Sequence, residues 1–233
     1  KPQLYLNTSI KGFNNIIENS RIINVKHFIF ASTSSVYGNL QKYPYKETFK
    51  NLSPESLYAA TKLTNENIAY SFSKIFKLPC TGIRFFTVYG PYGRPDMSLF
   101  KFVSNIKKNK HIDLYNYGDH MRDFTYIDDA INYLNRLIIT IPKSKIPYEI
   151  YNIAGGKSVK LKKYVKVIEE ELKSKIEINQ IELQKGDVRK THADITKISL
   201  ATKYRPKTEI RKGIVKFLKW YNEYFEDEIK WLF

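Results

Sequence analysis

Short apolar runs alternate with amphipathic stretches along this chain, and the alternation predicts an α/β protein. Residues 27–31, 79–86 and 148–153 are largely apolar runs of strand length, each followed by hydroxyl or glycine residues. Runs of this kind are typical of buried strands in parallel sheets. We therefore expect these three segments to lie in one doubly wound parallel sheet.

Helices are predicted where apolar residues recur at a spacing of three or four positions. The expected helices are residues 7–20, 54–76, 98–108, 130–141, 160–173, 194–202 and 210–225. Two more strands are expected at residues 111–115 and 176–183. Asp128 and Asp129 precede the fourth helix, where a carboxylate can cap the first turn. This order of elements indicates a parallel sheet together with a smaller α/β unit.

Two polar groups near the first apolar run provide candidate chemistry. The hydroxyl cluster at residues 32–35 ends the first strand, and ligands bind at the carboxyl ends of strands in open α/β sheets. Tyr58 and Lys62 are four residues apart, so they share one face of the expected helix. An ammonium beside a phenol favours the phenolate. Together with Thr33 or a neighbouring hydroxyl, these residues predict a site that removes the proton of an alcohol.

This arrangement resembles the short-chain dehydrogenase/reductase superfamily, in the extended branch that modifies sugar nucleotides. The resemblance is carried by the STSSVYG segment at residues 32–38 and the YAATK segment at residues 58–62. It implies a Rossmann-type fold, NAD as the cofactor, and Thr33, Tyr58 and Lys62 as catalytic residues. The cofactor-binding residues that it implies are Ala31, Ser32, Tyr58, Lys62, Phe85 and Val88.

A second stretch narrows the resemblance to one group of enzymes. Residues 84–102 and 116–129 are similar to UDP-glucuronate 4-epimerases, and this similarity extends over nearly the whole chain. Most relatives have Asn where this chain has Thr87, whereas Thr is typical of the glucuronate epimerases and leaves room for a sugar carboxylate. Arg94 offers the charged hydrogen-bond partner that a uronate requires.

The resemblance also implies contacts with the nucleotide part of the substrate. Arg122 is expected at the diphosphate and Asp187 near the uridine ribose. Several UDP-hexose epimerases have Arg where this chain has Gln184, so Lys185 or Arg189 is expected to take over that contact. The full set of implied substrate-binding residues is Ser34, Ser35, Thr87, Arg94, Arg122 and Asp187.

The hydroxyl cluster also separates this chain from related activities. Sugar-nucleotide 4,6-dehydratases place Asp-Glu directly after the catalytic Thr, and UDP-glucuronate decarboxylases place Glu just before the VYG triplet. Ser34 and Ser35 occupy these positions here, and neither can act as a carboxyl acid. Oxidation and re-reduction at C4 are therefore favoured. Another nucleotide-sugar epimerase or the decarboxylase stays open, as does an inactive fragment or a basic binding module.

The resemblance implies a mechanism through a 4-keto sugar. Tyr58 would remove the C4 hydroxyl proton, Lys62 would hold the nicotinamide ribose, and Thr33 would bind the developing ketone. The keto sugar would then turn about its diphosphate and be reduced on the other face, which exchanges UDP-glucuronate and UDP-galacturonate. Thr87 and Arg94 would hold the carboxylate against decarboxylation.

The glycine pattern predicts that the chain carries part of a larger dinucleotide-binding fold. A complete unit has a G-x-x-G-x-x-G turn after its first strand, and these 233 residues contain none. Since a βαβ unit takes about 30 residues, roughly 90 residues are expected to precede this segment in a parent protein that holds the activity. We expect residues 1–90 to form a partial NAD-binding domain. Residues 91–233 are expected to form mainly the substrate domain, with segments at about residues 111–153 returning to the Rossmann sheet.

Composition changes this picture little. The formal charge of +16 reflects 39 Lys and Arg against 23 Asp and Glu. The basic residues form no stripe or nucleic-acid-binding motif, so we expect a solvated surface that suits an anionic substrate, and no nucleic-acid partner. The single cysteine, Cys80, excludes an internal disulfide, and four isolated histidines have no ligand spacing. No metal site is therefore expected.

Location and assembly are also predicted. No apolar run is long enough for a membrane span and no signal peptide is visible, so we expect a cytoplasmic protein without membrane contact. Relatives commonly dimerise through two helices that correspond to residues 7–20 and 58–76 here. The resemblance therefore implies a homodimer.

Overall fold

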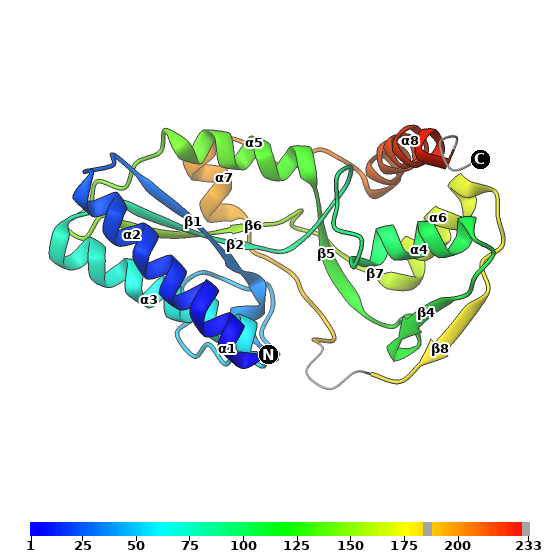
Figure 1. Ribbon diagram of the computed structural model, residues 1–233, viewed down its shortest axis with the longest axis horizontal. Coiled ribbons are helices and arrows are strands. Elements are labelled where there is room, and N and C mark those ends of the chain that lie inside the picture. The colour runs from blue at the N-terminus through cyan, green and yellow to red at the C-terminus, as the bar shows by residue number, and fades with distance from the viewer. Residues whose placement is uncertain (184–187, 230–233) are drawn as a thin grey trace.

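A parallel sheet forms from the three apolar runs. The computed structural model describes residues 1–183 and 188–229. The strands of this sheet are β1 (Phe28–Thr33), β2 (Cys80–Phe85) and β6 (Tyr148–Ile153). They pair in parallel in the order β1-β2-β6 (Figure 1). The predicted α/β fold with a parallel sheet is confirmed.

Helices cover both faces of this sheet (Figure 1). These helices are α2 (Gly12–Ile22), α3 (Leu57–Phe76), α5 (Ile127–Ile138) and α7 (Thr196–Thr202). Phe28 and Phe30 of β1 pack toward α2 and α3, whereas Ile83 of β2 and Tyr151 of β6 pack toward α5 and α7. Side chains alternate across a strand, so a fully apolar run supplies two buried faces.

The first helix is longer than its pattern predicted. It begins with α1 (Pro2–Tyr5), continues through a π-helical segment, η1 (Leu6–Lys11), and ends with α2. Pro2 stands in the first turn, where its missing N–H costs nothing. The expected start at residue 7 is wrong because the π-helical turn interrupts the regular spacing of apolar residues.

A second group of elements forms the other half of the molecule (Figure 1). Its strands are β3 (Thr87–Tyr89), β4 (Ile112–Tyr115), β5 (Met121–Tyr126), β7 (Ser158–Lys160) and β8 (Ile178–Ile181), and its helices are α4 (Ser98–Lys107), α6 (Leu161–Leu172) and α8 (Ile210–Ile229). Short 3₁₀ turns, η2 (Ser34–Tyr37) and η3 (Asn116–Gly118), complete the described elements. Strands β3, β5 and β7 form one sheet, and β4 pairs with β8.

The pairing shows which segments of residues 111–153 lie in the first sheet. Strand β6 lies in the first sheet, but β4 and β5 belong to the other two sheets. Helix α5 also starts at Ile127, so Asp128 and Asp129 lie in its first turn, and neither caps it through a side-chain hydrogen bond. Asp129 instead accepts a hydrogen bond from the Tyr204 hydroxyl at 2.5 Å. In the part of the chain that the structure describes, no helix is both long and apolar enough to span a bilayer.

Candidate active site

Thr33 ends β1 and begins the turn that carries the hydroxyl cluster. Its extended backbone places its side chain at the N-cap of η2, where its Oγ1 accepts from the Ser35 amide at 3.2 Å. The same hydroxyl donates to Ser35 Oγ, also at 3.2 Å. Gly38 closes the turn with a φ of +59°, and a Cβ there would lie 1.9 Å from the Ser53 carbonyl oxygen. The cluster is therefore held close to the end of the strand.

Helix α3 places Tyr58 in its first turn. Ser56 caps this helix, because its Oγ accepts from the Ala59 amide at 3.1 Å. The Tyr58 ring is 39% exposed and meets the edge of Tyr5 with ring centroids 6.5 Å apart. Its phenol is therefore accessible at the end of the helix that lies nearest to the hydroxyl cluster.

Lys62 connects this helix to the first strand. Its Nζ lies 5.9 Å from the centroid of the Tyr58 ring and donates to the carbonyl of Ala31 at 3.1 Å. Burial lowers the pKa of Lys62, because it disfavours the charged form. The structure thus places Tyr58 and Lys62 on one helix face, beside the strand that ends two residues later at Thr33.

Two adjoining hollows lie near the hydroxyl cluster, and the residues just before α3 border the smaller one. A cavity of about 600 Å³ lies between α4, β4 and β5, and a pocket of about 170 Å³ lies at the hydroxyl cluster. Thr87 and Arg122 line both, and Ser34 and Ser35 line the smaller one. The larger volume is within the range of small-molecule sites. Four of the expected substrate-binding residues therefore meet at one place.

Arg94 lines a hollow together with Thr87, but it does not line the pocket at the hydroxyl cluster. It lines a third hollow, of about 350 Å³, together with Thr87, Phe85 and Val88. Its exposed guanidinium is bidentate to Asp96, with Nε 2.9 Å from Oδ1. This hydrogen bonding raises the pKa of Arg94. The arginine that lines the pocket of Ser34 and Ser35 is Arg122, whose Nη1 also donates to the Met121 carbonyl at 3.2 Å.

Ser32 has a different position from the one expected of a cofactor-binding side chain. It is 3% exposed, and its hydroxyl donates to Glu66 Oε1 at 2.5 Å. Successive side chains point to opposite faces of a strand, so Ser32 is directed into the interior under α3. Asp187 lies outside the described residues.

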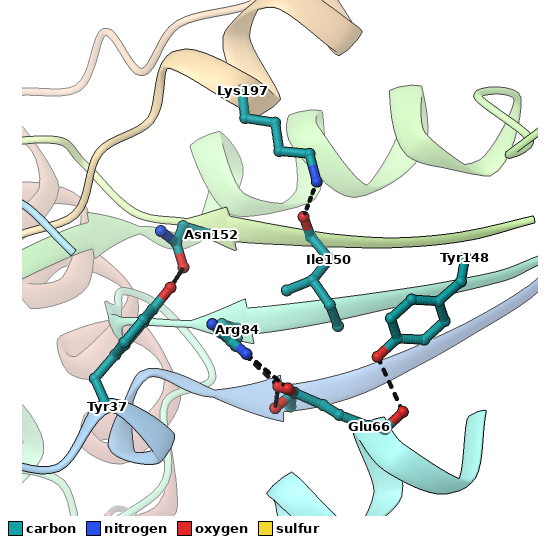
Figure 2. Close-up of polar contacts among 8 residues, drawn as sticks. Tyr37, Glu66, Arg84, Tyr148, Ile150, Asn152 and Lys197 are labelled. Carbon is teal, nitrogen blue, oxygen red and sulfur yellow. Dashed lines mark hydrogen bonds and ion pairs between the residues drawn. The ribbon is translucent and has the colours of Figure 1, made fainter. Parts of the chain in front are cut away.

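A buried polar network behind the hydroxyl cluster was not predicted (Figure 2). Arg84 donates to Glu66 through Nε at 2.9 Å and Nη2 at 2.7 Å, and its guanidinium lies 4.8 Å from the centroid of the Tyr37 ring. Tyr37 donates to Asn152 at 2.8 Å. Two signals in the sequence point to this network: a charged residue inside an apolar run, and an acid eight residues after Tyr58 on the same helix.

A second buried acid lies on the other side of the site. Asp123 of β5 accepts hydrogen bonds from the amides of Gly156 and Ala193, both at 3.0 Å. Burial raises the pKa of Asp123 to about 7, although these amides act in the opposite direction. The side chain therefore ties β5 to two neighbouring loops.

The donor groups fit a nicotinamide ribose beside a sugar alcohol. An ammonium, an accessible phenol and a hydroxyl cluster gather at the carboxyl end of a parallel sheet, where nucleotide cofactors bind in open α/β folds. Lys62 and the backbone at Ala31 would hold the ribose of a bound NAD. The fold and these groups define a nucleotide-dependent enzyme of the α/β class.

Comparison with known proteins identifies the family. The chain belongs to the NAD dependent epimerase/dehydratase family, whose model matches residues 1–154. Membership confirms the predicted resemblance, and the dependence on NAD is a property of this family.

Similar proteins cover most of the chain. It is 41% identical to protein CapI of Staphylococcus aureus, over 97% of this chain and 72% of that protein. It is 36% identical to a probable UDP-glucuronate 4-epimerase of Rhizobium meliloti, over 95% of this chain and 70% of that protein.

A solved structure agrees with the fold. UDP-glucuronic acid 4-epimerase from Bacillus cereus, in complex with UDP-glucuronic acid and NAD, matches with a TM-score of 0.87 and 29% identity. The match covers 94% of this chain and 68% of that one. A UDP-N-acetylglucosamine 4-epimerase from Methanobrevibacter ruminantium gives a TM-score of 0.87 at 25% identity, over 96% of this chain and 71% of that one.

Proposed function

We propose that the protein catalyses the NAD-dependent 4-epimerisation of a UDP-uronate, converting UDP-glucuronate to UDP-galacturonate. The observation that carries this proposal is the contact of Lys62 with both the Tyr58 ring and the Ala31 carbonyl of β1, together with a hollow at the hydroxyl cluster that Thr87 and Arg122 line. The relatives named for UDP-glucuronate 4-epimerase activity support the choice of substrate.

Each residue of the site has a proposed role. Tyr58 is the general base that removes the proton of the C4 hydroxyl, since its phenol is accessible. Lys62 orients the ribose and places its ammonium beside the Tyr58 ring, 5.9 Å from the ring centroid. Thr33 donates to the developing ketone oxygen in place of its present bond to Ser35. Bound NAD supplies the oxidation and the reduction at C4.

A uronate nucleotide carries two anionic groups, a diphosphate and a carboxylate. Arg122 lines both hollows in which we propose that these groups bind. It lines the larger cavity, where a diphosphate fits, and also the pocket of Ser34 and Ser35. An arginine can bind a phosphate or carboxylate through two parallel hydrogen bonds. Arg94 reaches the substrate only by exchanging its partner Asp96 for the sugar carboxylate. Ser34 and Ser35 supply no acid for elimination.

A second candidate is the epimerisation of a neutral UDP-sugar. Glu55 also lines the small pocket, and a carboxylate there opposes a uronate but accepts hydrogen bonds from sugar hydroxyls. The similarity to a UDP-N-acetylglucosamine 4-epimerase points in the same direction. The two candidates differ only in the charge of the sugar.

Substrate competition distinguishes the two candidates. The natural protein is incubated with NAD and equal amounts of UDP-glucuronate, UDP-glucose and UDP-N-acetylglucosamine, and products are resolved by chromatography. We expect UDP-galacturonate to form at least about ten times faster than either neutral product, because a lost charged hydrogen bond costs about 1.5–3 kcal/mol. Faster conversion of a neutral sugar, or formation of UDP-pentose by loss of CO₂, contradicts the uronate assignment. Arg94→Ala should lower the preference for the uronate.

We also propose that the protein forms a homodimer through the helix at residues 2–22 and α3. Large apolar side chains on these helices are exposed: Leu4 57%, Ile16 62%, Tyr70 41% and Ile75 67%. Exposed large apolar side chains on neighbouring helices are typical of an interface. Sedimentation should give twice the chain mass for the wild type and the chain mass for Ile16→Lys/Ile75→Lys. A wild-type monomer contradicts the proposal.

A further inference from the structure

One row of the first sheet is polar across its full width. Ser32 of β1 is in register with Arg84 of β2, and Arg84 is in register with Asn152 of β6. All three side chains are at most 3% exposed. Residues in register on neighbouring strands point to the same face. The row therefore presents a line of buried polar groups to the helix packed above it.

Glu66 of α3 meets this row (Figure 2). It is 4% exposed, and its carboxylate accepts from Ser32 and from two nitrogens of Arg84, at 2.5 to 2.9 Å. Its backbone carbonyl accepts from the Tyr148 hydroxyl at 3.0 Å. Ser32 lies on β1, Arg84 on β2 and Tyr148 on β6, so Glu66 forms a hydrogen bond with a residue of each of the three strands.

Glu66 and its partner Ser32 both lie close in the chain to proposed catalytic residues. Glu66 follows Lys62 by four positions and Tyr58 by eight, so the three share one side of α3. Ser32 directly precedes Thr33. The bonds from Glu66 therefore connect the helix that carries the phenol and the ammonium to the strand that carries the hydroxyl.

Stability alone does not account for such a contact. Desolvation of two buried charges offsets their attraction, and well-packed apolar residues of similar size often give equal or greater stability. A bidentate ion pair has a fixed direction, however, whereas apolar side chains permit a helix to slide or rotate. The pair is therefore suited to fix a position rather than to add stability.

We propose that Glu66 is a positioning residue, which through Arg84 and Ser32 holds α3, and with it Tyr58 and Lys62, in its place beside the end of β1. The position of α3 can be followed at Lys62, because its Nζ donates a hydrogen bond to the Ala31 carbonyl of β1 at 3.1 Å. A shift of α3 lengthens that bond and exposes the ammonium. The effect on turnover rests on the proposed function, whereas the effect on Lys62 does not.

The test replaces the polar contact with an apolar one of similar size, in the variant Ser32→Ala/Glu66→Leu/Arg84→Met. We expect its melting temperature to stay near that of the wild type. Turnover of the UDP-sugar should fall at least about tenfold with KM changed less than about twofold, since small displacements of catalytic groups lower the rate strongly. The matched control is Ser73→Ala, which removes a buried bond of 2.8 Å to the Leu78 carbonyl near the far end of α3. This control should keep the wild-type kcat.

A second readout needs no turnover. The rate of Lys62 acylation is measured against pH by mass spectrometry of its peptide, in the wild type, the triple variant and the control. Burial lowers the pKa of Lys62, so the triple variant should move this profile toward that of an exposed lysine. Unchanged kcat and an unchanged Lys62 profile overturn the proposal. If the wild type turns over no UDP-sugar, the proposed function fails and the Lys62 profile alone decides. If the triple variant does not fold, Glu66→Gln is compared with Ser73→Ala by the same two measurements.

Discussion

The two halves of the molecule are built around different interiors. The sheet half contains β1, β2 and β6 with α2, α3, α5 and α7, and a buried ion pair of Glu66 and Arg84 lies near its centre. The other half contains the remaining sheets with α4, α6 and α8, and its core is a large apolar cluster. In this cluster the rings of Phe124 and Tyr164 stack with their centroids 4.2 Å apart.

This difference matches the tasks proposed for each half. The sheet half carries Thr33, Tyr58 and Lys62, whose relative positions must be fixed within fractions of an ångström for proton transfer. Directional polar bonds supply that precision. The other half supplies the walls of a large cavity through residues such as Thr87 and Arg122. Packing alone suffices to shape a wall.

The largest effect is expected from the phenol of the sheet half. Tyr58→Phe should lower turnover by about 10²–10⁴-fold, since it removes the general base. The free energy of unfolding should change by less than about 0.5 kcal/mol, because the ring is exposed. Turnover and thermal unfolding are measured on the same preparation. Tyr70→Phe, on the same helix and also exposed, is the matched control and should keep its activity. Retained epimerisation in Tyr58→Phe contradicts the assigned role.

The second effect is confined to the apolar interior of the other half. Tyr164→Ala should lower the free energy of unfolding by about 3–5 kcal/mol, since it leaves a cavity beside Phe124. Tyr164→Phe should be neutral or stabilising, because the buried hydroxyl has no hydrogen-bond partner among the described residues. Denaturant unfolding measures both. A large loss in Tyr164→Phe would show that this core also depends on a polar contact.

A pH effect tests the buried acid of the other half. The pKa of Asp123 is about 7 in the fold and 3.8 in the unfolded reference, so the unfolded chain releases this proton first as pH rises. The contribution of Asp123 to stability is therefore full below about pH 4 and is lost as pH rises toward 7, at up to about 1.4 kcal/mol per pH unit. Asp123→Asn should remove this slope from urea-unfolding data, whereas Asp119→Asn, at an exposed carboxylate, should keep it. If the free energy of unfolding of Asp123→Asn falls with pH as steeply as that of the wild type, Asp123 is not the source of the pH dependence.

The smallest effect is expected from the wall residue Arg122. Arg122→Ala should raise KM for the UDP-sugar about ten- to a hundredfold with a smaller change in kcat, because a charged hydrogen bond contributes about 1.5–3 kcal/mol. Arg122→Lys keeps the charge without the planar fork and should give an intermediate KM. Steady-state kinetics measure both variants. A fall in kcat with constant KM would place Arg122 among the positioning groups instead.

Local patterns in the sequence predicted the elements that depend on local structure. The apolar runs gave the strands of the first sheet, and the spacing of Tyr58 and Lys62 gave a shared helix face that the structure confirms. Strands β3 and β7 were missed because three residues are too few to show a period. Strand β5 was also missed, because its first half contains two charged residues, Arg122 and Asp123.

Contacts between distant residues were not predictable in the same way. Ser32 was assigned to the cofactor, but its partner Glu66 is 34 positions away, and only the fold brings them together. Whether a side chain faces a site or a neighbour depends on tertiary packing, which the local pattern does not contain.

The most direct test uses UDP-glucuronate with deuterium at C4. The natural protein is supplied with NAD, and the product is analysed by NMR and mass spectrometry. We expect UDP-galacturonate that keeps the deuterium at C4, because the hydrogen removed from that carbon is returned to its other face. Absence of an epimer, or an epimer with hydrogen from solvent at C4, contradicts the proposed function.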